Sequence, residues 1–197
     1  MGYPQYPEPI APTPIKIVIA GGFGVGKTTA VGVISDSPPL TTEAAMTDVA
    51  AQIDRTGEIP EKTTTTVAID FGTIRLDEGL KLYLFGTPGQ DRFGFMWHDI
   101  CLGALGALVI VDTRRLDDCF PAVDYFEERL IPFLVAVNRF DQAPRFELEE
   151  VREALGIDEP TPVVECDARL RESVKEVLVA LVTQIIMVRQ SVGAGAR

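Results

Sequence analysis

Residues 21–28 of this 197-residue chain have the types and spacing of a loop that binds phosphate groups. Four of them, Gly21, Gly26, Lys27 and Thr28, match the fixed positions of the pattern G-x-x-x-x-G-K-[ST]. Glycines let a backbone curl so that successive N–H groups point at one anion. We expect Lys27 to contact the terminal phosphates and the Thr28 hydroxyl to ligate Mg²⁺. The predicted binding residues of the loop are Gly21, Gly22, Phe23, Gly24, Val25, Gly26, Lys27, Thr28 and Thr29.

The flanking sequence supplies the elements that such a loop needs. The β-branched apolar run 15–20 predicts a buried strand before the loop, and residues 29–34 are compatible with a helix after it. The helix N-terminus would add its partial positive charge to the phosphate site. This loop alone does not distinguish an ATPase, a kinase and a GTPase.

A second polar segment, Asn138-Arg139-Phe140-Asp141, directly follows the predicted strand 133–137. It resembles the N-K-x-D guanine-recognition box of small GTPases, with Arg139 in place of lysine. A carboxylate at Asp141 can accept both N1–H and the 2-amino group of guanine, a donor pair that adenine lacks. The resemblance implies that Asn138 ties the box to the phosphate loop and that the stem of Arg139 covers one face of the base. A guanidinium stacks on flat rings at least as well as lysine does.

A third segment, Cys166-Asp167-Ala168-Arg169, follows the short predicted strand 162–165. Its place corresponds to the S-A-K segment of the same proteins. The resemblance implies contact of Asp167, Ala168 and Arg169 with the nucleotide, the Ala168 N–H donating to guanine O6.

Residues 86–93 resemble the D-x-x-G-Q-E-R-F switch segment of Rab-like proteins. By that resemblance the Gly89 N–H meets the γ-phosphate and Gln90 orients the attacking water, so Lys27, Gly89 and Gln90 are the predicted catalytic residues. Gly86, however, replaces the aspartate that normally holds a Mg²⁺-bound water. The predicted metal ligands are therefore Thr28 and a switch threonine, with Asp112 as a possible helper.

Residues 66–72 match the T-I-G-x-[DE]-F-G start of the second strand in Rab-like GTPases, which makes Thr66 the predicted switch threonine. Residues 63–65 are threonines as well and remain rivals. Related proteins of the MglA type carry an arginine at the place of Thr65. An arginine finger raises the rate by roughly 10³–10⁵, so its absence predicts slow unaided hydrolysis.

Across residues 15–190 the chain resembles bacterial small GTPases of the conservon (CvnD) type, related to MglA. The resemblance implies a GTP-binding switch that uses GTP or GDP and Mg²⁺. It also implies two partners, a roadblock/LC7-domain regulator and a sensor-kinase-like protein. Two other hypotheses stay open: a pseudo-GTPase that holds nucleotide as a scaffold, and a P-loop protein that uses ATP.

Alternating strands and helices after one hairpin predict an α/β fold, a doubly wound, mostly parallel sheet of the Ras-like P-loop NTPase kind. We expect six strands, one of them an antiparallel edge strand, with helices on both faces. Residues 43–53 are compatible with a short helix. The expected strands are 15–20, 67–76, 80–85, 104–111, 133–137 and 162–165, and the expected helices are 29–34, 96–101, 118–130, 147–155 and 172–189.

Composition sets the remaining expectations. A formal net charge of −11 argues against binding to nucleic acid and allows at most an indirect association with membranes. Three widely spaced cysteines are typical of buried free thiols in a reducing cytoplasm. We expect a flexible proline-rich arm at 1–14, a nucleotide-binding domain at 15–190 and a disordered tail at 191–197.

Overall fold

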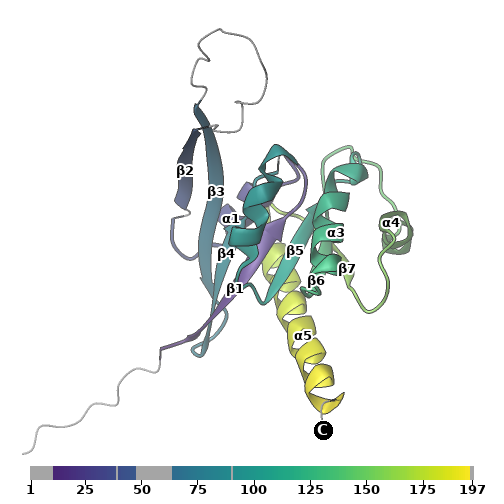
Figure 1. Cartoon of the computed structure of the whole chain (residues 1–197). Helices are drawn as coiled ribbons and strands as arrows, with labels where there is room; N and C mark the ends of the chain where they lie inside the picture. The colour runs from purple at the N-terminus through teal and green to yellow at the C-terminus, as the bar shows by residue number, and fades with distance from the viewer. Residues whose placement is uncertain (1–10, 39, 48–63, 90, 196–197) are drawn as a thin grey trace, which may run out of the picture.

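The computed structural model describes residues 11–38, 40–47, 64–89 and 91–195. Among these residues, seven strands form a single sheet in the order β2-β3-β4-β1-β5-β6-β7 (Figure 1). The strands are β1 Thr13–Ala20, β2 Leu40–Thr47, β3 Thr64–Arg75, β4 Leu80–Gly86, β5 Gly106–Val111, β6 Phe133–Asn138 and β7 Val163–Cys166. Neighbours from β4 to β7 pair in parallel, whereas β3 is antiparallel to both β2 and β4.

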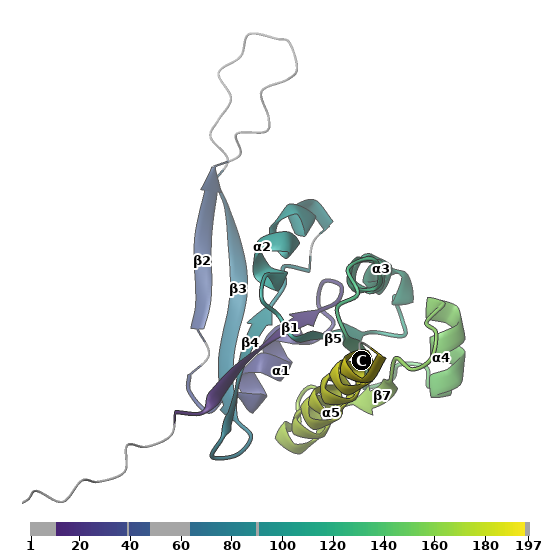
Figure 2. The same ribbon diagram turned by 60° about the horizontal axis from the view of Figure 1, so that its bottom comes forward.

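Helices cover both faces of this sheet, so the predicted doubly wound architecture is confirmed (Figure 2). The α-helices are α1 Lys27–Ile34, α2 Trp97–Cys101, α3 Phe120–Glu128, α4 Leu148–Leu155 and α5 Arg171–Gly195, and two 3₁₀ helices are Asp91–Met96 and Leu116–Cys119. α1 and α5 bury their apolar residues on one face, and α2, α3 and α4 on the other.

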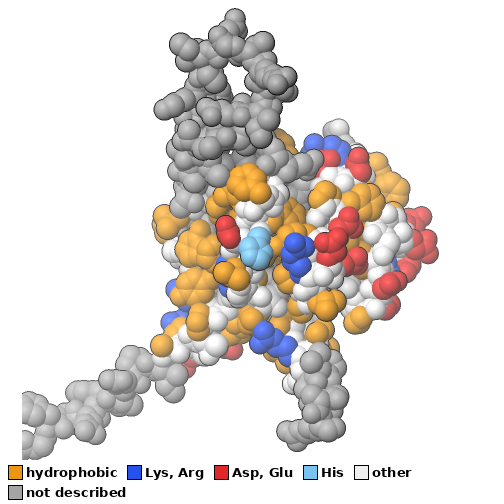
Figure 3. All heavy atoms as spheres, in the orientation of Figure 1, with side chains coloured by type: hydrophobic (Ala, Val, Ile, Leu, Met, Phe, Trp, Pro, Cys, Tyr) orange, Lys and Arg blue, Asp and Glu red, His pale blue; other side chains and the backbone are white. Residues whose placement is uncertain are grey.

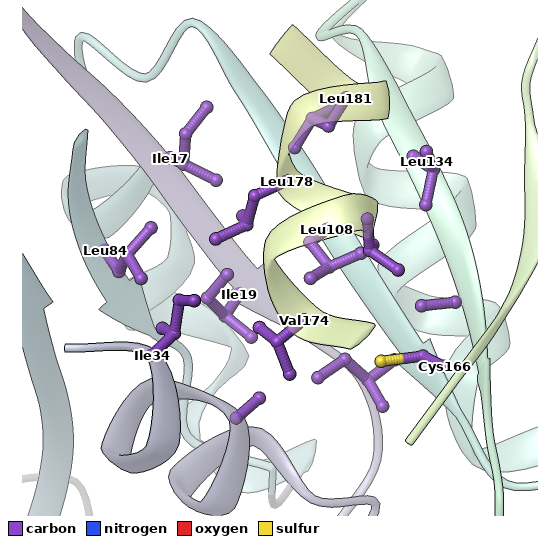
Figure 4. Close-up of a cluster of buried hydrophobic side chains, with 14 of the residues drawn as sticks. Ile17, Ile19, Ile34, Leu84, Leu108, Leu134, Cys166, Val174, Leu178 and Leu181 are labelled. Carbon is purple, nitrogen blue, oxygen red and sulfur yellow. The ribbon is translucent and has the colours of Figure 1, made fainter. Parts of the chain in front are cut away.

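The core on the α1 and α5 side shows why these segments become helices and strands. The predicted helical stripe of α5 is buried as expected, and Figure 4 shows Val174, Leu178 and Leu181 pointing at strand residues that include Ile19 and Leu108. Every residue of β5 is buried, because helices cover it from both sides. Burying one such aliphatic side chain contributes roughly 1.5–3 kcal/mol.

The ends of two helices follow their local sequence. α4 begins at a capping box in which the side chains of Glu147 and Glu150 each accept from the other's backbone N–H. It ends at Gly156, whose φ of 66° is left-handed, as the sequence predicts. Pro121 lies in the first turn of α3, where its missing N–H costs no hydrogen bond.

The prediction of a short helix at 43–53 is wrong for its first half, because residues 40–47 form the strand β2. Eight residues of β2 pair with Thr64–Phe71 of β3. β2 therefore lies outside the antiparallel strand that the sequence places at the edge, and it adds a seventh strand to the six expected. Alanine, glutamate and methionine in this segment favour a helix locally, but pairing with the open backbone of β3 overrides that preference. Residues 48–63 lie outside the described residues.

The chain ends also differ from the expected boundaries. β1 begins at Thr13, whose N–H donates to Gly79 O at 2.7 Å, so the last two residues of the expected arm belong to the sheet. α5 continues to Gly195, five residues into the segment expected to be disordered. Each residue added to an existing helix gains one backbone hydrogen bond, which offsets the weak propensity of glycine. Within the described part of the chain, no helix is long and apolar enough to span a membrane.

The surface carries the excess of negative charge unevenly. Figure 3 shows acidic side chains gathered over α3 and α4, while apolar side chains gather on the other side of the same view. A phosphate backbone would be repelled by the acidic face. This acidic face is therefore unsuited to binding an anionic ligand.

Candidate functional site

The phosphate loop, residues 21–26, joins the carboxyl end of β1 to α1. Gly26 has a φ of 108°, and a Cβ on it would lie 2.7 Å from Asn138 Nδ2, so no other residue fits there. α1 begins at Lys27 with neither a side-chain cap nor an acidic residue in its first turn. Its first N–H groups and the positive end of its dipole thus remain for an anion.

Lys27 is held at the centre of this loop. Its ammonium donates to Gly21 O at 2.8 Å and to Gly22 O at 2.6 Å, and the residue is only 8% exposed. Burial lowers the pKa of Lys27 from 10.5 to about 8, and the negative charge of Asp70 partly opposes this shift. An ammonium has three donors, so one N–H is left for a phosphate oxygen.

Two cavities meet at the loop. One, of about 450 Å³, is lined by loop residues together with Lys27, Thr28, Asp70 and Gly89. The other, of about 370 Å³, is lined by loop residues and by Asn138-Arg139-Phe140-Asp141, Ala168 and Arg169. We call it the base cavity, and residues 138–141 the base segment, after the base contacts that the sequence predicts there. Both cavities lie at the carboxyl ends of parallel strands, where open α/β sheets bind their ligands. The structure thus brings the predicted phosphate and base residues to one edge.

Asp70 of β3 is a site residue that the sequence analysis did not single out. Its Oδ2 accepts the Thr28 hydroxyl at 2.6 Å. It also packs beside Gly86, where an added Cβ would lie 3.1 Å from Asp70 Cβ and 3.3 Å from Asp70 Oδ2. The neighbouring strand β3 thus places the carboxylate of Asp70 beside position 86, where the resemblance leads one to expect an aspartate. The signal in the sequence was a single acidic residue within the short apolar run 67–71.

Asp112 has a different task. Its carboxylate is buried and pairs with Arg114, Oδ2 to Nη2 being 2.6 Å, and it also accepts the Arg114 backbone N–H. The hydrogen bond from the Arg114 side chain holds the pKa of Asp112 below its usual value. Asp112 therefore shapes the turn after β5, and the structure gives no support for its helping to hold a metal.

The switch residues are placed unequally. Gly89 lies against the phosphate loop, since a Cβ on it would be 2.6 Å from Lys27 Nζ and 2.8 Å from Gly22 O. Thr66 lies in β3, where its register partner is Ala45 of β2. Gln90 lies outside the described residues. The catalytic role of Gln90 and the metal role of Thr66 stay predictions.

Asn138 joins the base segment to the phosphate loop, as the sequence predicts. Its Nδ2 donates to Val25 O at 2.8 Å, and its Oδ1 accepts the Ala168 N–H at 2.9 Å. Asn138 and Ala168 are both buried. Three segments that are far apart in the sequence therefore meet through one side chain. The Ala168 N–H, expected to donate to guanine O6, already has this acceptor.

Asp141 and Arg169 form an ion pair at the rim of the base cavity. Arg169 Nη1 donates to Asp141 Oδ2 at 3.0 Å, while its Nε and Nη2 each donate at 2.9 Å to the carboxylate of Asp167. The Arg169 hydrogen bond holds the pKa of Asp167 below its usual value, and both carboxylates raise the pKa of Arg169. Arg139 is hydrogen-bonded to Glu165 of β7 and lines the same cavity.

The sheet order, the phosphate loop and the hydrogen bonds of Asn138 define a P-loop nucleotide-binding protein with a Ras-like α/β fold. Comparison with solved structures supports this fold. The G domain of the Thermotoga maritima FeoB iron transporter superposes with a TM-score of 0.61 at 16% identity, over 87% of this chain and 99% of that one. The FeoB G domain of Methanococcus jannaschii gives a TM-score of 0.58 at 16% identity, over 87% of this chain and 98% of that one. At such identities the likeness shows the fold alone.

The chain belongs to the family described as conserved hypothetical ATP binding protein, whose model matches residues 19–188. It is 30% identical to the uncharacterized protein MJ1339 of Methanocaldococcus jannaschii over 129 residues, 64% of this chain and 71% of that protein. It is 27% identical to the Ras-related protein SEC4 of Saccharomyces cerevisiae over 143 residues, 66% of each. The ADP-ribosylation factor-like protein 3 of the same yeast is 27% identical over 100 residues, and this chain covers 50% of it. The closer resemblance to conservon and MglA proteins stays a prediction.

Proposed function

We propose that this chain is a GTP-binding molecular switch that hydrolyses GTP slowly. The observation that carries the proposal is the position of Asn138, which donates to the phosphate loop at Val25 O and accepts from the base segment at Ala168. The base segment thereby stands next to the phosphate cradle, with Asp141 at its rim. The similarity to a Ras-related protein, at 27% identity, agrees with guanine as the base.

Magnesium fits the residues beside the loop. The Thr28 hydroxyl and the Asp70 carboxylate are hard oxygen donors only 2.6 Å apart, the kind of ligand that Mg²⁺ prefers. Among the described residues no group of three acidic, histidine or cysteine side chains could hold a metal without help. Thr28 and Asp70, with Thr66 as a further proposed ligand, would hold the ion together with phosphate oxygens. The ion would supply neutralisation of phosphate charge.

Hydrolysis would depend on the residues around Lys27. In the proposal Lys27 binds the terminal phosphates, the Gly89 N–H contacts the γ-phosphate and Gln90 orients water. Gly89 already lies against Lys27, which supports this part of the proposal. Thr65 stands where related proteins carry an arginine, so we expect slow turnover and a need for a partner that accelerates it.

The partners are proposed from the sequence resemblance. They are a roadblock/LC7-domain regulator and a sensor-kinase-like protein of one bacterial signalling complex, with a cytoplasmic location. In this role the described part of the switch segment and the β2–β3 ribbon would report the bound nucleotide. Acceleration of single-turnover GTP hydrolysis by a candidate regulator would test this, and acceleration by any partner would refute a purely scaffolding role.

ATP is the second candidate ligand, because the family carries an ATP-binding description. Competition of GTP and ATP for a fluorescent nucleotide on the purified wild-type protein decides between the two. A preference for GTP supports the proposal, and a preference for ATP refutes it.

A variant of Asp141 tests whether its carboxylate determines the preference for guanine. Asp141→Asn should shift binding from GTP towards XTP, because an amide can donate to the xanthine O2 that a carboxylate repels. Asp158→Asn, an equal charge change at an exposed residue that does not line the cavity, is the control and should leave the preference unchanged. For Gln90→Leu, single-turnover assays should show slower GTP hydrolysis, and the competition assay should show that nucleotide binding is retained.

A further inference from the structure

Two backbone N–H groups beside the base cavity, those of Ala168 and Arg169, already have acceptors inside the protein. The Ala168 N–H donates to Asn138 Oδ1 at 2.9 Å, and the Arg169 N–H donates to Asp167 Oδ1 at 3.0 Å. Guanine O6 is a hydrogen-bond acceptor that loses its water when the base is bound. Leaving it unpaired would cost free energy, so the base needs a donor other than these two amides.

The guanidinium of Arg169 is the cationic donor in the right place. It lines the base cavity and touches Asp141, the carboxylate that we propose accepts from guanine N1–H and the 2-amino group. A guanidinium has five N–H donors. In the described structure three of them have acceptors: two on Asp167 and one on Asp141.

Asp167 holds Arg169 in this orientation. The bidentate pair fixes the plane of the guanidinium, and the Asp167 side chain is only 14% exposed. Its own backbone N–H donates to Ser173 Oγ at 2.9 Å, which fixes the loop to the start of α5. Arg169 is therefore oriented by its protein neighbours, and little conformational entropy is lost when a base arrives.

We propose that Asp141 and Arg169 act as one unit that reads the Watson–Crick edge of guanine. This inference rests on the proposed function. Asp141 accepts from N1–H and the 2-amino group, and Arg169 donates to O6 in place of the backbone amide. Arginine paired with guanine O6 is a common contact in nucleic-acid recognition. Adenine would present its 6-amino donor to the Arg169 donors, so the unit discriminates against ATP as well.

The test uses three nucleotides that differ at the base edge. GTP has O6, N1–H and the 2-amino group, ITP keeps O6 and N1–H, and 2-aminopurine riboside triphosphate keeps the 2-amino group but lacks both O6 and N1–H. Dissociation constants are measured for wild type and Arg169→Ala by displacement of a fluorescent nucleotide. Losing a charge-assisted hydrogen bond should weaken GTP and ITP by about tenfold or more, and should leave the 2-aminopurine nucleotide within about twofold.

Two further variants make the result specific. Arg189→Ala removes an equal charge from an exposed position on α5 and should change none of the three constants. Arg169→Lys keeps a cationic donor and should retain part of the difference between GTP and the 2-aminopurine nucleotide. Thermal unfolding reports whether each variant is folded.

Several outcomes would overturn the inference. Equal losses for all three nucleotides would show that Arg169 acts through net charge, and no loss would show that it does not touch the base. Tighter GTP binding by Arg169→Ala would show that Arg169 competes with the base for Asp141. If wild type prefers ATP, the proposed function fails, and that result is read before any variant is compared.

Discussion

Lys27 holds a positive charge where burial disfavours it, and this predicts a pH dependence of stability. Its pKa is lowered from 10.5 to about 8 in the folded protein, mainly by burial. Below pH 8 the folded and unfolded states both carry the proton, and the cost of burying the charge is fully present. Between about pH 8 and 10.5 the folded state releases the proton first, so stability rises with pH.

The size of the effect follows from the pKa shift. At 1.36 kcal/mol for each pKa unit, the full shift corresponds to roughly 3 kcal/mol. Between pH 7 and pH 9.5, Lys27 alone should raise the free energy of unfolding of the nucleotide-free protein by roughly 2 kcal/mol. Other groups titrate in this range, so a variant must isolate the contribution of Lys27.

Urea unfolding of wild type and Lys27→Met at pH 7, 8.5 and 9.5 measures that contribution. Methionine has a similar length and no charge, so the variant should lack the rise of roughly 2 kcal/mol. Lys175→Met changes a half-exposed lysine and should keep the rise seen in wild type. An identical pH dependence in wild type and Lys27→Met would refute the reasoning, because Lys27 would then titrate alike in both states.

Three further outcomes follow from contacts at the site and in the core. Asp70→Asn should reduce the gain in nucleotide affinity that Mg²⁺ gives by about 10–100-fold in a metal titration. The double variant Asp70→Ala with Gly86→Asp should recover part of this gain. An equal Mg²⁺ dependence in all variants would remove Asp70 from the metal site. Asn138→Ala leaves the buried Val25 carbonyl without its donor and should lower the free energy of unfolding by about 1–3 kcal/mol for that group; an unchanged unfolding midpoint would contradict this. Burial raises the pKa of Cys119 to about 12, so mass spectrometry should find it unmodified after a thiol reagent is added to native protein at pH 8, and modified once urea is present.

Much of where the candidate site residues lie could be predicted from the sequence, because these residues belong to local patterns. The backbone geometry of the phosphate loop requires the glycines and Lys27 at set positions within eight residues, so the pattern can be recognised in the sequence. Asn138 follows a buried strand, so its place at the carboxyl edge of the sheet follows from the topology alone. The contact from Asn138 to the phosphate loop is confirmed.

The features that the sequence analysis missed depend on pairing between distant segments. Asp70 lies beside Gly86 because β3 and β4 are neighbours, with Phe71 paired opposite Phe85. β2 forms because β3 offers an open edge, whereas its own residues favour a helix. The pairing of Arg169 with both Asp141 and Asp167 likewise depends on side-chain orientation across two loops.

The junction at Asn138 has a consequence for how ligands of different size should bind. Because Asn138 fixes the spacing between the phosphate loop and the base cavity, a nucleotide that binds as proposed should act as a bivalent ligand with two linked contact points. Inorganic triphosphate and free guanosine each reach one point and should each bind weakly. The covalent linkage through ribose makes the second contact intramolecular, so affinity for the whole nucleotide should greatly exceed that for either fragment.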